Sequence, residues 1–188
     1  MKIICITGKS GSGKTYLASM LASKLICYVI DIDRIAHDVL FNQKVRQEVL
    51  KVFGNGVFDG KFINRKKLGA IVFNDETKLR FLESLTQKQM EEVIDTKLAR
   101  IDTKYVILEY SLLPKMKYFE KSNFNILVEA NDNVRENRIL KRDNISKEYF
   151  ESREANSLDY SGYKFDLVVN NTKNFDVDQI ISKIKSKK

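Results

Sequence analysis

The chain has 188 residues, enough for one domain with a substantial core, and 33 lysines and arginines against 25 acidic residues give it a net charge of +8. It lacks an apolar run of about 18 residues, which excludes a transmembrane helix. One histidine argues against zinc, and two cysteines without C-x-x-C spacing favour free thiols. An apolar segment begins almost at the first residue and leaves no room for a signal peptide, so we expect a cytoplasmic protein.

The positive charge suits a protein that binds polyanionic small molecules, and it also suits nucleic-acid binding. A basic cluster occupies residues 183–188, but no aromatic residues are interleaved with it to stack on bases. We therefore expect a small-molecule partner, and neither nucleic acid nor a membrane. No pattern in the sequence indicates an oligomeric state.

Short apolar segments alternate with helical patterns along the chain. Five of these segments are typical of buried strands, namely residues 3–6, 27–30, 105–108, 124–128 and 166–169. Apolar residues three and four apart predict helices at residues 17–25, from Met90 to Ile101, from about Asp132, and at residues 177–184. This order predicts an α/β fold, a three-layer sandwich in which helices cover both faces of a five-stranded parallel sheet.

Residues 53–73 break the alternation. Gly54-Asn55-Gly56 and Asp59-Gly60 are turn signals that lie close together, and a helical pattern resumes from about Arg65. We interpret this region as an insertion with tight turns in a single domain.

A glycine-rich segment joins the first predicted strand to the first predicted helix. It matches G-x-x-x-x-G-K-[ST] through Gly8, Lys9, Ser10, Gly11, Ser12, Gly13, Lys14 and Thr15. Glycines let backbone N–H groups converge on phosphates, and the helix N-terminus adds partial positive charge. Lys14 can reach the β- and γ-phosphates, and the Thr15 hydroxyl can hold Mg²⁺. With a strand before it and a helix after it, the segment predicts a site for a nucleoside triphosphate rather than a chance glycine-rich turn.

Carboxylates follow two of the predicted strands. Ligands of open parallel sheets bind beyond the carboxyl ends of the strands, which selects Asp31, Asp33 and Glu109. We favour Asp31 as the N-cap of the next helix and Asp33 as the carboxylate that accepts a proton from an acceptor hydroxyl. The alternative, that either aspartate only caps the helix, stays open. Glu109 is either a carboxylate near Mg²⁺ or a generic acid at a strand end.

Three arginines share one face of the helix predicted from about Asp132. Arg135, Arg138 and Arg142 are spaced by three and four residues, whereas Ile139 falls on another face. We expect the arginines to point outward or into a cleft. They form either a lid over the triphosphate or a solvated basic face. Ser146 is the expected cap of the following helix.

Together these segments resemble the dephospho-coenzyme A kinase family over nearly the whole chain. The D-x-D motif of Asp31 and Asp33 and the spacing of the insertion are more specific to that family than the glycine-rich loop. The segments that carry the resemblance are residues 6–15, Val29 to Ala36, Phe53-Gly54, Asp59-Gly60, Arg65, Leu68, Val72-Phe73, Arg142-Asp143 and Asn170-Asn171.

The resemblance implies a P-loop kinase that transfers the γ-phosphate of ATP to the 3′-hydroxyl of dephospho-CoA, the last step of coenzyme A synthesis. It implies an acceptor-binding insertion at about residues 40–100 and a helical lid at about residues 132–156. By the same resemblance Asp33 is the general base, and Lys14 and Thr15 serve the phosphates and Mg²⁺. Arg138 and Arg142 belong to the nucleotide side, and Arg34 and Arg65 to the acceptor side.

Three positions depart from the family pattern. Thr86-Gln87 stand where His-Pro is usual, Glu109-Tyr110-Ser111 replace the start of Asp-x-Pro-Leu-Leu, and His37 replaces a common arginine. These changes lie on the acceptor side. They leave open another nucleotide or nucleoside kinase on the same scaffold. The basic charge leaves open a P-loop ATPase or nucleic-acid-binding protein without a small acceptor.

Overall fold

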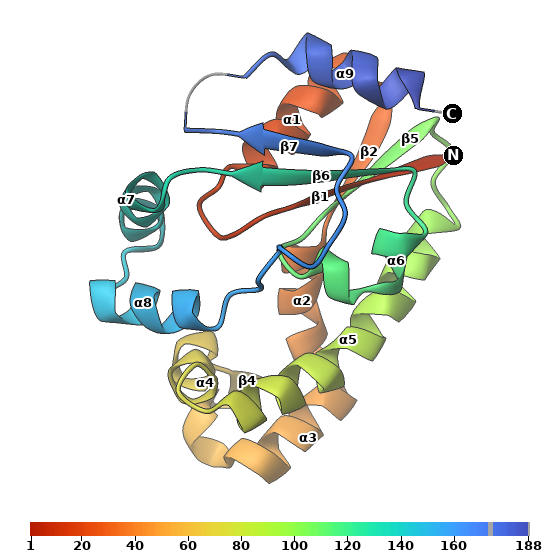
Figure 1. The fold of residues 1–188 in the computed structure, drawn as a ribbon. Helices are drawn as coiled ribbons and strands as arrows, with labels where there is room; N and C mark the ends of the chain where they lie inside the picture. The colour runs from red at the N-terminus through yellow and green to blue at the C-terminus, as the bar shows by residue number, and fades with distance from the viewer. Residues whose placement is uncertain (173–174, 188) are drawn as a thin grey trace. The chain divides into compact units, whose positions relative to one another are not determined.

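The computed structural model describes residues 1–172 and 175–187 of the chain. These residues form two compact units (Figure 1). The first unit comprises Met1–Asp31, Ile101–Phe150 and Ser157–Lys188, and the second comprises Ile32–Arg100 and Glu151–Asn156. Among the described residues, no helix combines the length and hydropathy that a membrane span requires.

The first unit is built on a five-stranded parallel sheet, which confirms the predicted fold class. Its strand order is β2-β5-β1-β6-β7, and each strand boundary lies within one residue of its predicted position. The strands are β1 (Lys2–Thr7), β2 (Cys27–Asp31), β5 (Tyr105–Glu109), β6 (Phe124–Glu129) and β7 (Leu167–Asn170). Because all strands are parallel, their carboxyl ends meet at one edge of the sheet, where the glycine-rich loop begins.

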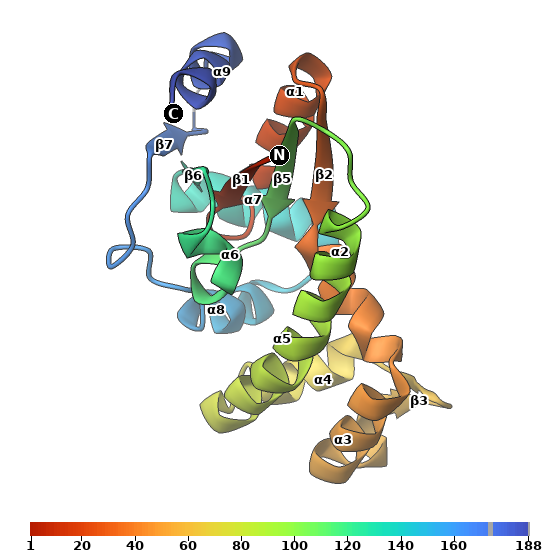
Figure 2. The ribbon, with the colours of Figure 1, turned by 90° about the vertical axis from the view of Figure 1, so that its right-hand side faces the viewer.

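Helices α1 (Lys14–Lys24) and α9 (Val177–Ser186) cover one face of this sheet (Figure 2). Leu17 and Leu21 of α1 pack with Ile180 of α9 against the side chains of Ile4 and other residues on that face. A short turn η3 (Leu113–Lys115) and helix α6 (Lys117–Glu120) follow β5. Helix α7 (Asp132–Asp143) follows β6, and helix α8 spans Lys147–Ala155. Ser146 accepts a hydrogen bond from the N–H of Tyr149 at 3.2 Å, which confirms its capping role.

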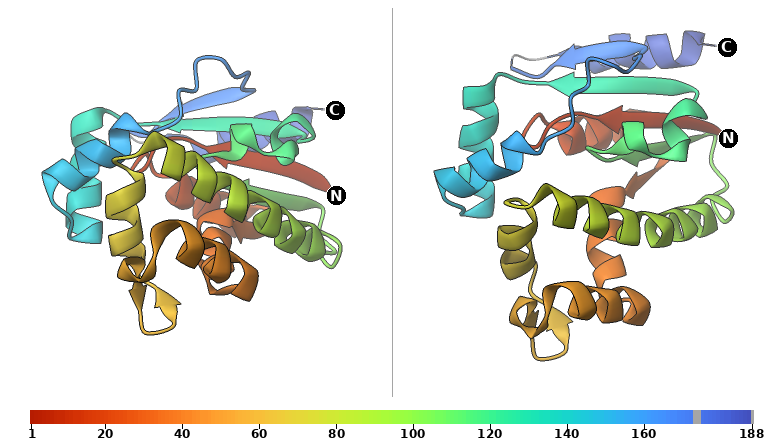
Figure 3. Two further views of the ribbon diagram at one scale, coloured as in Figure 1. Left: turned by 90° about the horizontal axis from the view of Figure 1, so that it is seen from below. Right: turned by 60° about the horizontal axis from the view of Figure 1, so that its bottom comes forward.

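The second unit is helical and has its own core (Figure 3). Its helices are α2 (Ile32–Asp38), α3 (Gln43–Phe53), α4 (Arg65–Val72) and α5 (Glu76–Leu98), with turns η1 (Val39–Phe41) and η2 (Asn55–Val57). The predicted tight turns form a small hairpin of β3 (Phe58–Asp59) and β4 (Phe62–Ile63), with Gly60 at φ +59°. The buried side chains of this core are Val45, Val49, Val57, Leu68 and Val72.

One predicted helix boundary is wrong. The apolar spacing from Met90 to Ile101 predicts a helix through Ile101, but α5 ends at Leu98. The Ala99 N–H bonds to the carbonyls of Asp95 and Lys97 and closes the last turn, so Ile101 already belongs to the connection that leads to β5.

Candidate active site

The glycine-rich loop between β1 and α1 needs its glycines for two physical reasons. Gly8, Gly11 and Gly13 have φ of 146°, 74° and 98°, in the region where side chains are strained. A Cβ on Gly8 would lie 2.1 Å from the carbonyl oxygen of Val128, and one on Gly13 would lie 1.9 Å from Nδ2 of Asn171. The loop therefore takes a close-packed path that any larger residue would disrupt.

Side chains hold four successive carbonyl oxygens of this loop. In a trans peptide the N–H points away from the C=O, so a donor that fixes a carbonyl also fixes the direction of the next N–H. The loop N–H groups and the α1 N-terminus are thereby arranged for an anion. The hydrogen bonds run from Lys14 Nζ to Lys9 O at 3.3 Å, Arg135 Nη1 to Ser10 O at 3.0 Å, Arg138 Nη1 to Gly11 O at 3.2 Å, and Asn171 Nδ2 to Ser12 O at 2.8 Å.

Arg135 does not point outward; it lies at the border of a cavity beside the loop, in agreement with the second of the two predicted directions. It is 2% exposed, and its guanidinium bonds to Asp132 Oδ1 at 2.9 Å as well as to the loop. The prediction that Ile139 lies on another face than the arginines is wrong for Arg135, because Arg135 and Ile139 are the buried residues of α7 and both lie against Gly11 of the loop. Helical spacing alone cannot identify this packing.

The other two arginines of α7 are exposed to solvent, and each has different partners. Arg138 donates to the carbonyl of Gly11 and to that of Asn171, the latter at 3.1 Å. Arg142 pairs with Asp143 at 2.6 Å and its side chain is 63% exposed. The first turns of α7 thus hold the loop through Arg135 and Arg138, and Arg142 lies exposed near the C-terminal end of the helix.

Two oxygen-bearing side chains meet at the carboxyl edge of the sheet. Thr15 Oγ1 donates a hydrogen bond of 2.6 Å to Glu109 Oε1, although the residues are 94 positions apart. Glu109 is 3% exposed and pairs in register with Ile6 on β1 and Asp31 on β2. The rule of strand ends correctly predicts that Glu109 and the loop lie at one edge.

The predicted acceptor-side residues belong to the second unit. Helix α2 starts at Ile32, so Asp31 precedes its first residue and Asp33 lies in its first turn. A carboxylate in the first turn of a helix is favoured by the helix dipole. Asp33 and Arg34 are exposed, and Arg65, the first residue of α4, contacts His37.

Asn171 is a site residue that the reasoning from the sequence did not assign. It is 8% exposed and directly follows β7, where it holds the carbonyl of Ser12. The rule of strand ends would have selected it, because Asn170 closes β7 at the same edge of the sheet as the loop.

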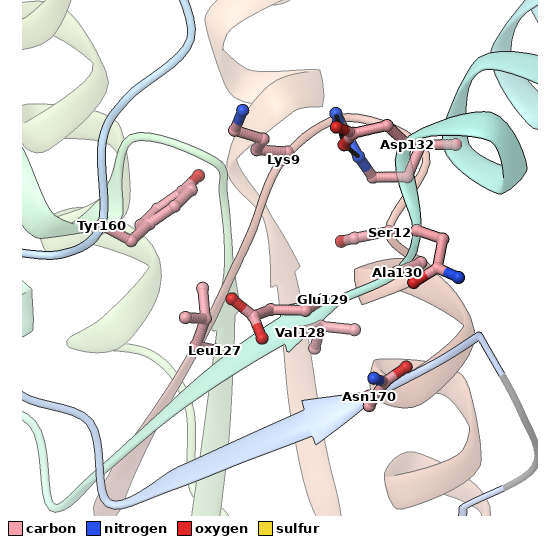
Figure 4. A pocket seen from close by; sticks show the side chains of 11 residues that line it. Lys9, Ser12, Leu127, Val128, Glu129, Ala130, Asp132, Tyr160 and Asn170 are labelled. Carbon is pink, nitrogen blue, oxygen red and sulfur yellow. Dashed lines mark hydrogen bonds and ion pairs between the residues drawn. The ribbon is translucent and has the colours of Figure 1, made fainter.

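A cavity of about 420 Å³ borders the loop at the ends of β6 and β7 (Figure 4). Its lining includes Lys9 and Ser12, but neither Lys14 nor Thr15, the two side chains expected to serve the phosphates. The Ser12 hydroxyl is fully buried and points from the loop toward the space that Tyr160 also faces (Figure 4). The Tyr160 hydroxyl donates to the carbonyl of Ser111 at 2.7 Å.

The fold and this edge of the sheet define a P-loop protein of the kinase type. The parallel sheet, the glycine-rich loop between β1 and α1, and Lys14-Thr15 at the helix start are the features of that class. The dephospho-CoA kinase family model matches residues 2–176. The chain therefore belongs to the dephospho-CoA kinase family.

Individual relatives agree with this assignment. The chain is 41% identical over 159 residues to a dephospho-CoA kinase of Aquifex aeolicus, covering 81% of this chain and 79% of the relative. It is 34% identical over 183 residues to one of Dehalococcoides mccartyi, covering 94% and 91%. The crystal structure of TT1252 from Thermus thermophilus matches with a TM-score of 0.81 at 26% identity, covering 98% of this chain and 96% of that one.

Proposed function

We propose that this protein transfers the γ-phosphoryl group of ATP to the ribose 3′-hydroxyl of dephospho-CoA and so completes coenzyme A. The observation that carries the proposal is the match to the dephospho-CoA kinase family over residues 2–176. The loop, whose four carbonyls are held by side chains, supplies the donor half of such a site. A cytoplasmic location fits this role.

On the donor side, the loop N–H groups bind the phosphates of ATP and Lys14 neutralises charge on the group in transfer. Lys14 is 7% exposed, and its hydrogen bond to the carbonyl of Lys9 keeps the ammonium at the loop. Arg138 contributes to the nucleotide side from α7.

Thr15 and Glu109 fit a Mg²⁺ site. Mg²⁺ prefers oxygen ligands and retains several waters, so one hydroxyl and one nearby carboxylate suffice on the protein side. The hydrogen bond from Thr15 to Glu109 turns the hydroxyl proton toward the carboxylate, which leaves the oxygen lone pairs for a cation. When bound, the ion would neutralise charge on the β- and γ-phosphates.

On the acceptor side, Asp33 accepts the proton of the 3′-hydroxyl as that oxygen bonds to the γ-phosphorus and the bond to ADP breaks. Arg34 and Arg65 bind phosphates of the acceptor within an insertion at about residues 40–100. Residues 132–156 form the lid, from which Arg142 reaches the group in transfer.

The proposal is tested by measuring ADP release from ATP and Mg²⁺ with different acceptors. The panel contains dephospho-CoA, nucleosides, nucleoside monophosphates and a reaction without acceptor, with Lys14→Ala as the inactive control. We expect turnover with dephospho-CoA and a loss of at least about tenfold in Lys14→Ala. Preference for a nucleoside monophosphate would indicate another nucleotide kinase, and turnover without acceptor would indicate an ATPase.

A further inference from the structure

A second cavity adjoins the one that borders the glycine-rich loop. It has a volume of about 450 Å³, and all residues that line the two cavities belong to the first unit. Four residues line both cavities, which together form the β6 cleft: Lys9, Leu127, Glu129 and Tyr160. The two side chains expected to serve the phosphates line neither cavity. The β6 cleft therefore lies beside the proposed phosphate site and is not part of it.

One polar side chain in the β6 cleft lacks a hydrogen-bond partner. Ser12 is fully buried, and its hydroxyl, which faces the cleft in Figure 4, has no such partner among the described residues. A buried hydroxyl without a partner is costly, so native structures satisfy it with protein, water or a ligand. The β6 cleft is the space from which such a partner can reach Ser12.

The groups around this hydroxyl accept hydrogen bonds. The Tyr160 hydroxyl donates its proton to the carbonyl of Ser111, so its oxygen presents only lone pairs to the cleft. The carboxylate of Glu129, which faces the same space in Figure 4, has acceptors and no donor. The oxygen of Ser12 can accept as well. A ligand that satisfies these groups together must bring several donors, as a primary ammonium group does.

The charges that line the β6 cleft favour a cation. Arg135 pairs with Asp132 at 2.9 Å. Hydrogen bonds within its own turn hold the pKa of the Asp159 carboxyl below its ordinary value, and the ammonium of Lys9 lowers it further. Each of these two couples contains one positive and one negative charge. The carboxylate of Glu129 is then the excess charge of the cleft, and it attracts a cationic ligand.

The second cavity adds an apolar surface to the β6 cleft. Leu158 and Phe165 line it together with Leu127 and Tyr160. The rings of Tyr160 and Phe165 meet close to edge to face, with centroids 6.3 Å apart. An apolar group that is bound against these side chains leaves water, which favours binding. The cleft thus combines an acceptor-rich end at Ser12 with an apolar end at Phe165.

Ser12 also connects the β6 cleft to the phosphate-binding loop. Its N–H donates to the carbonyl of Lys9 at 3.2 Å, and Lys14 Nζ donates to the same carbonyl at 3.3 Å. Phosphates that bind in the loop compete for these two donors. A ligand that bonds to the Ser12 hydroxyl stabilises the loop in the arrangement seen here. Such a ligand therefore opposes the binding of phosphates.

We propose that the β6 cleft binds a small organic ammonium ion with an apolar tail, and that this ligand lowers the affinity for ATP through Ser12. The ammonium group bonds to Ser12, Glu129 and Tyr160, and the tail lies against Leu158 and Phe165. Linkage requires that ATP lowers the affinity for the amine by the same factor. The identification of ATP as the ligand of the loop rests on the proposed function, whereas the amine site does not.

The test of the site uses 2-phenylethylamine as the probe, with 2-phenylethanol and phenylacetate as molecules of similar shape that lack an ammonium group. Calorimetry measures their binding to the wild-type protein. We expect the alcohol and the acid to bind at least about tenfold more weakly than the amine. Glu129→Gln should weaken binding of the amine about tenfold or more. Glu120→Gln, which alters an exposed carboxylate of α6 that lines neither cavity, is the matched control and should bind the amine normally.

The test of the coupling measures the Kd for ATP with and without saturating amine. We expect the amine to raise this Kd about fivefold or more in the wild-type protein. Ser12→Ala should still bind the amine through Glu129, but the amine should no longer change its Kd for ATP. The comparison is made within each variant, so a direct effect of the substitution on the loop cancels.

Four results would overturn the inference. The first two are that the amine does not bind, or that all three probes bind equally. The third is unaltered binding in Glu129→Gln, which would place the probe elsewhere. The fourth is a Kd for ATP that the amine does not change, or changes equally in Ser12→Ala. A protein that binds ATP and the amine as described but does not phosphorylate dephospho-CoA overturns only the proposed function.

Discussion

The guanidinium of Arg135 donates from Nη1 to the carbonyl oxygen of Ser10 at 3.0 Å, and this arginine is one of the largest fully buried side chains among the described residues. A buried charge is costly unless it is paired and hydrogen-bonded, and Arg135 has both Asp132 and the loop as partners. The arginine thus anchors the phosphate-binding loop to α7, the helix that continues toward Arg142. The geometry of the loop depends on a residue 125 positions away in the sequence.

Arg135→Met should weaken ATP binding while the fold persists. Methionine preserves much of the packing but leaves the Ser10 carbonyl without its donor, which costs about 1–3 kcal/mol for a buried acceptor. We expect the Kd for ATP, measured by calorimetry, to rise roughly five- to a hundredfold. Lys141→Met, an exposed substitution on the same helix, is the control and should bind ATP normally. An unaltered Kd in folded Arg135→Met would show that the loop holds its shape without this anchor.

Asp33→Asn should abolish most turnover while ATP still binds. The amide cannot accept the proton of the acceptor hydroxyl, and loss of a general base typically lowers kcat by about 10²–10⁴-fold. Steady-state kinetics with dephospho-CoA measures kcat, and calorimetry measures the Kd for ATP. Asp38→Asn, an exposed aspartate at the end of the same helix, should behave like wild type. Near-normal kcat in Asp33→Asn would exclude the general-base role.

More of the fold than of the candidate site could be predicted from the sequence. Continuous apolar segments and glycine-rich turns are local signals, and they locate all five strands of the sheet to within one residue. Whether an arginine of α7 is buried or exposed is not determined by the neighbouring sequence. Helical periodicity predicts that Arg135 and Arg142 share a face, but only the packing of α7 on the loop decides that the first is buried and the second is 63% exposed.

The contact between Thr15 and Glu109 could be predicted only in part. The rule of strand ends predicts that both residues lie at one edge of the sheet, and it makes no statement about their distance. The hydrogen bond of 2.6 Å depends on the register Ile6↔Glu109, which the sequence does not encode locally. The contact between His37 and Arg65 joins α2 to the first residue of α4, and no local pattern in the sequence predicts that these two segments meet.

Arg142→Ala distinguishes a lid residue from a residue of a solvated basic face. If Arg142 stabilises charge on the group in transfer, kcat should fall about tenfold or more, because such donors act chiefly in the transition state. The pair of Arg142 with Asp143 is exposed, so its loss should lower the thermal stability only slightly. Lys141→Ala is the adjacent control for kcat and Tm. A change confined to Tm would support the solvated face.

Cys5 should resist alkylation until the protein unfolds. Burial in β1 raises the pKa of its thiol to about 12 from an ordinary value of 9.0, whereas Cys27 is only partly buried. Mass spectrometry after iodoacetamide treatment at pH 8 should show modification at Cys27 before Cys5. Because the folded pKa lies above the ordinary value, the stability due to the neutral thiol is complete below pH 9 and is lost as the pH rises toward 12. Rapid modification of Cys5 in the folded protein would contradict its placement in the sheet.

The central claim, that the γ-phosphoryl group of ATP is transferred to the 3′-hydroxyl of dephospho-CoA, is tested most directly by identifying the product. Purified protein is incubated with ATP, Mg²⁺ and dephospho-CoA, and the product is analysed by mass spectrometry and phosphorus NMR. The account predicts one new phosphomonoester on the ribose 3′-oxygen, formed in equal amount to ADP and identical to coenzyme A. A phosphate at another position, or ADP formed without a phosphorylated acceptor, would contradict it.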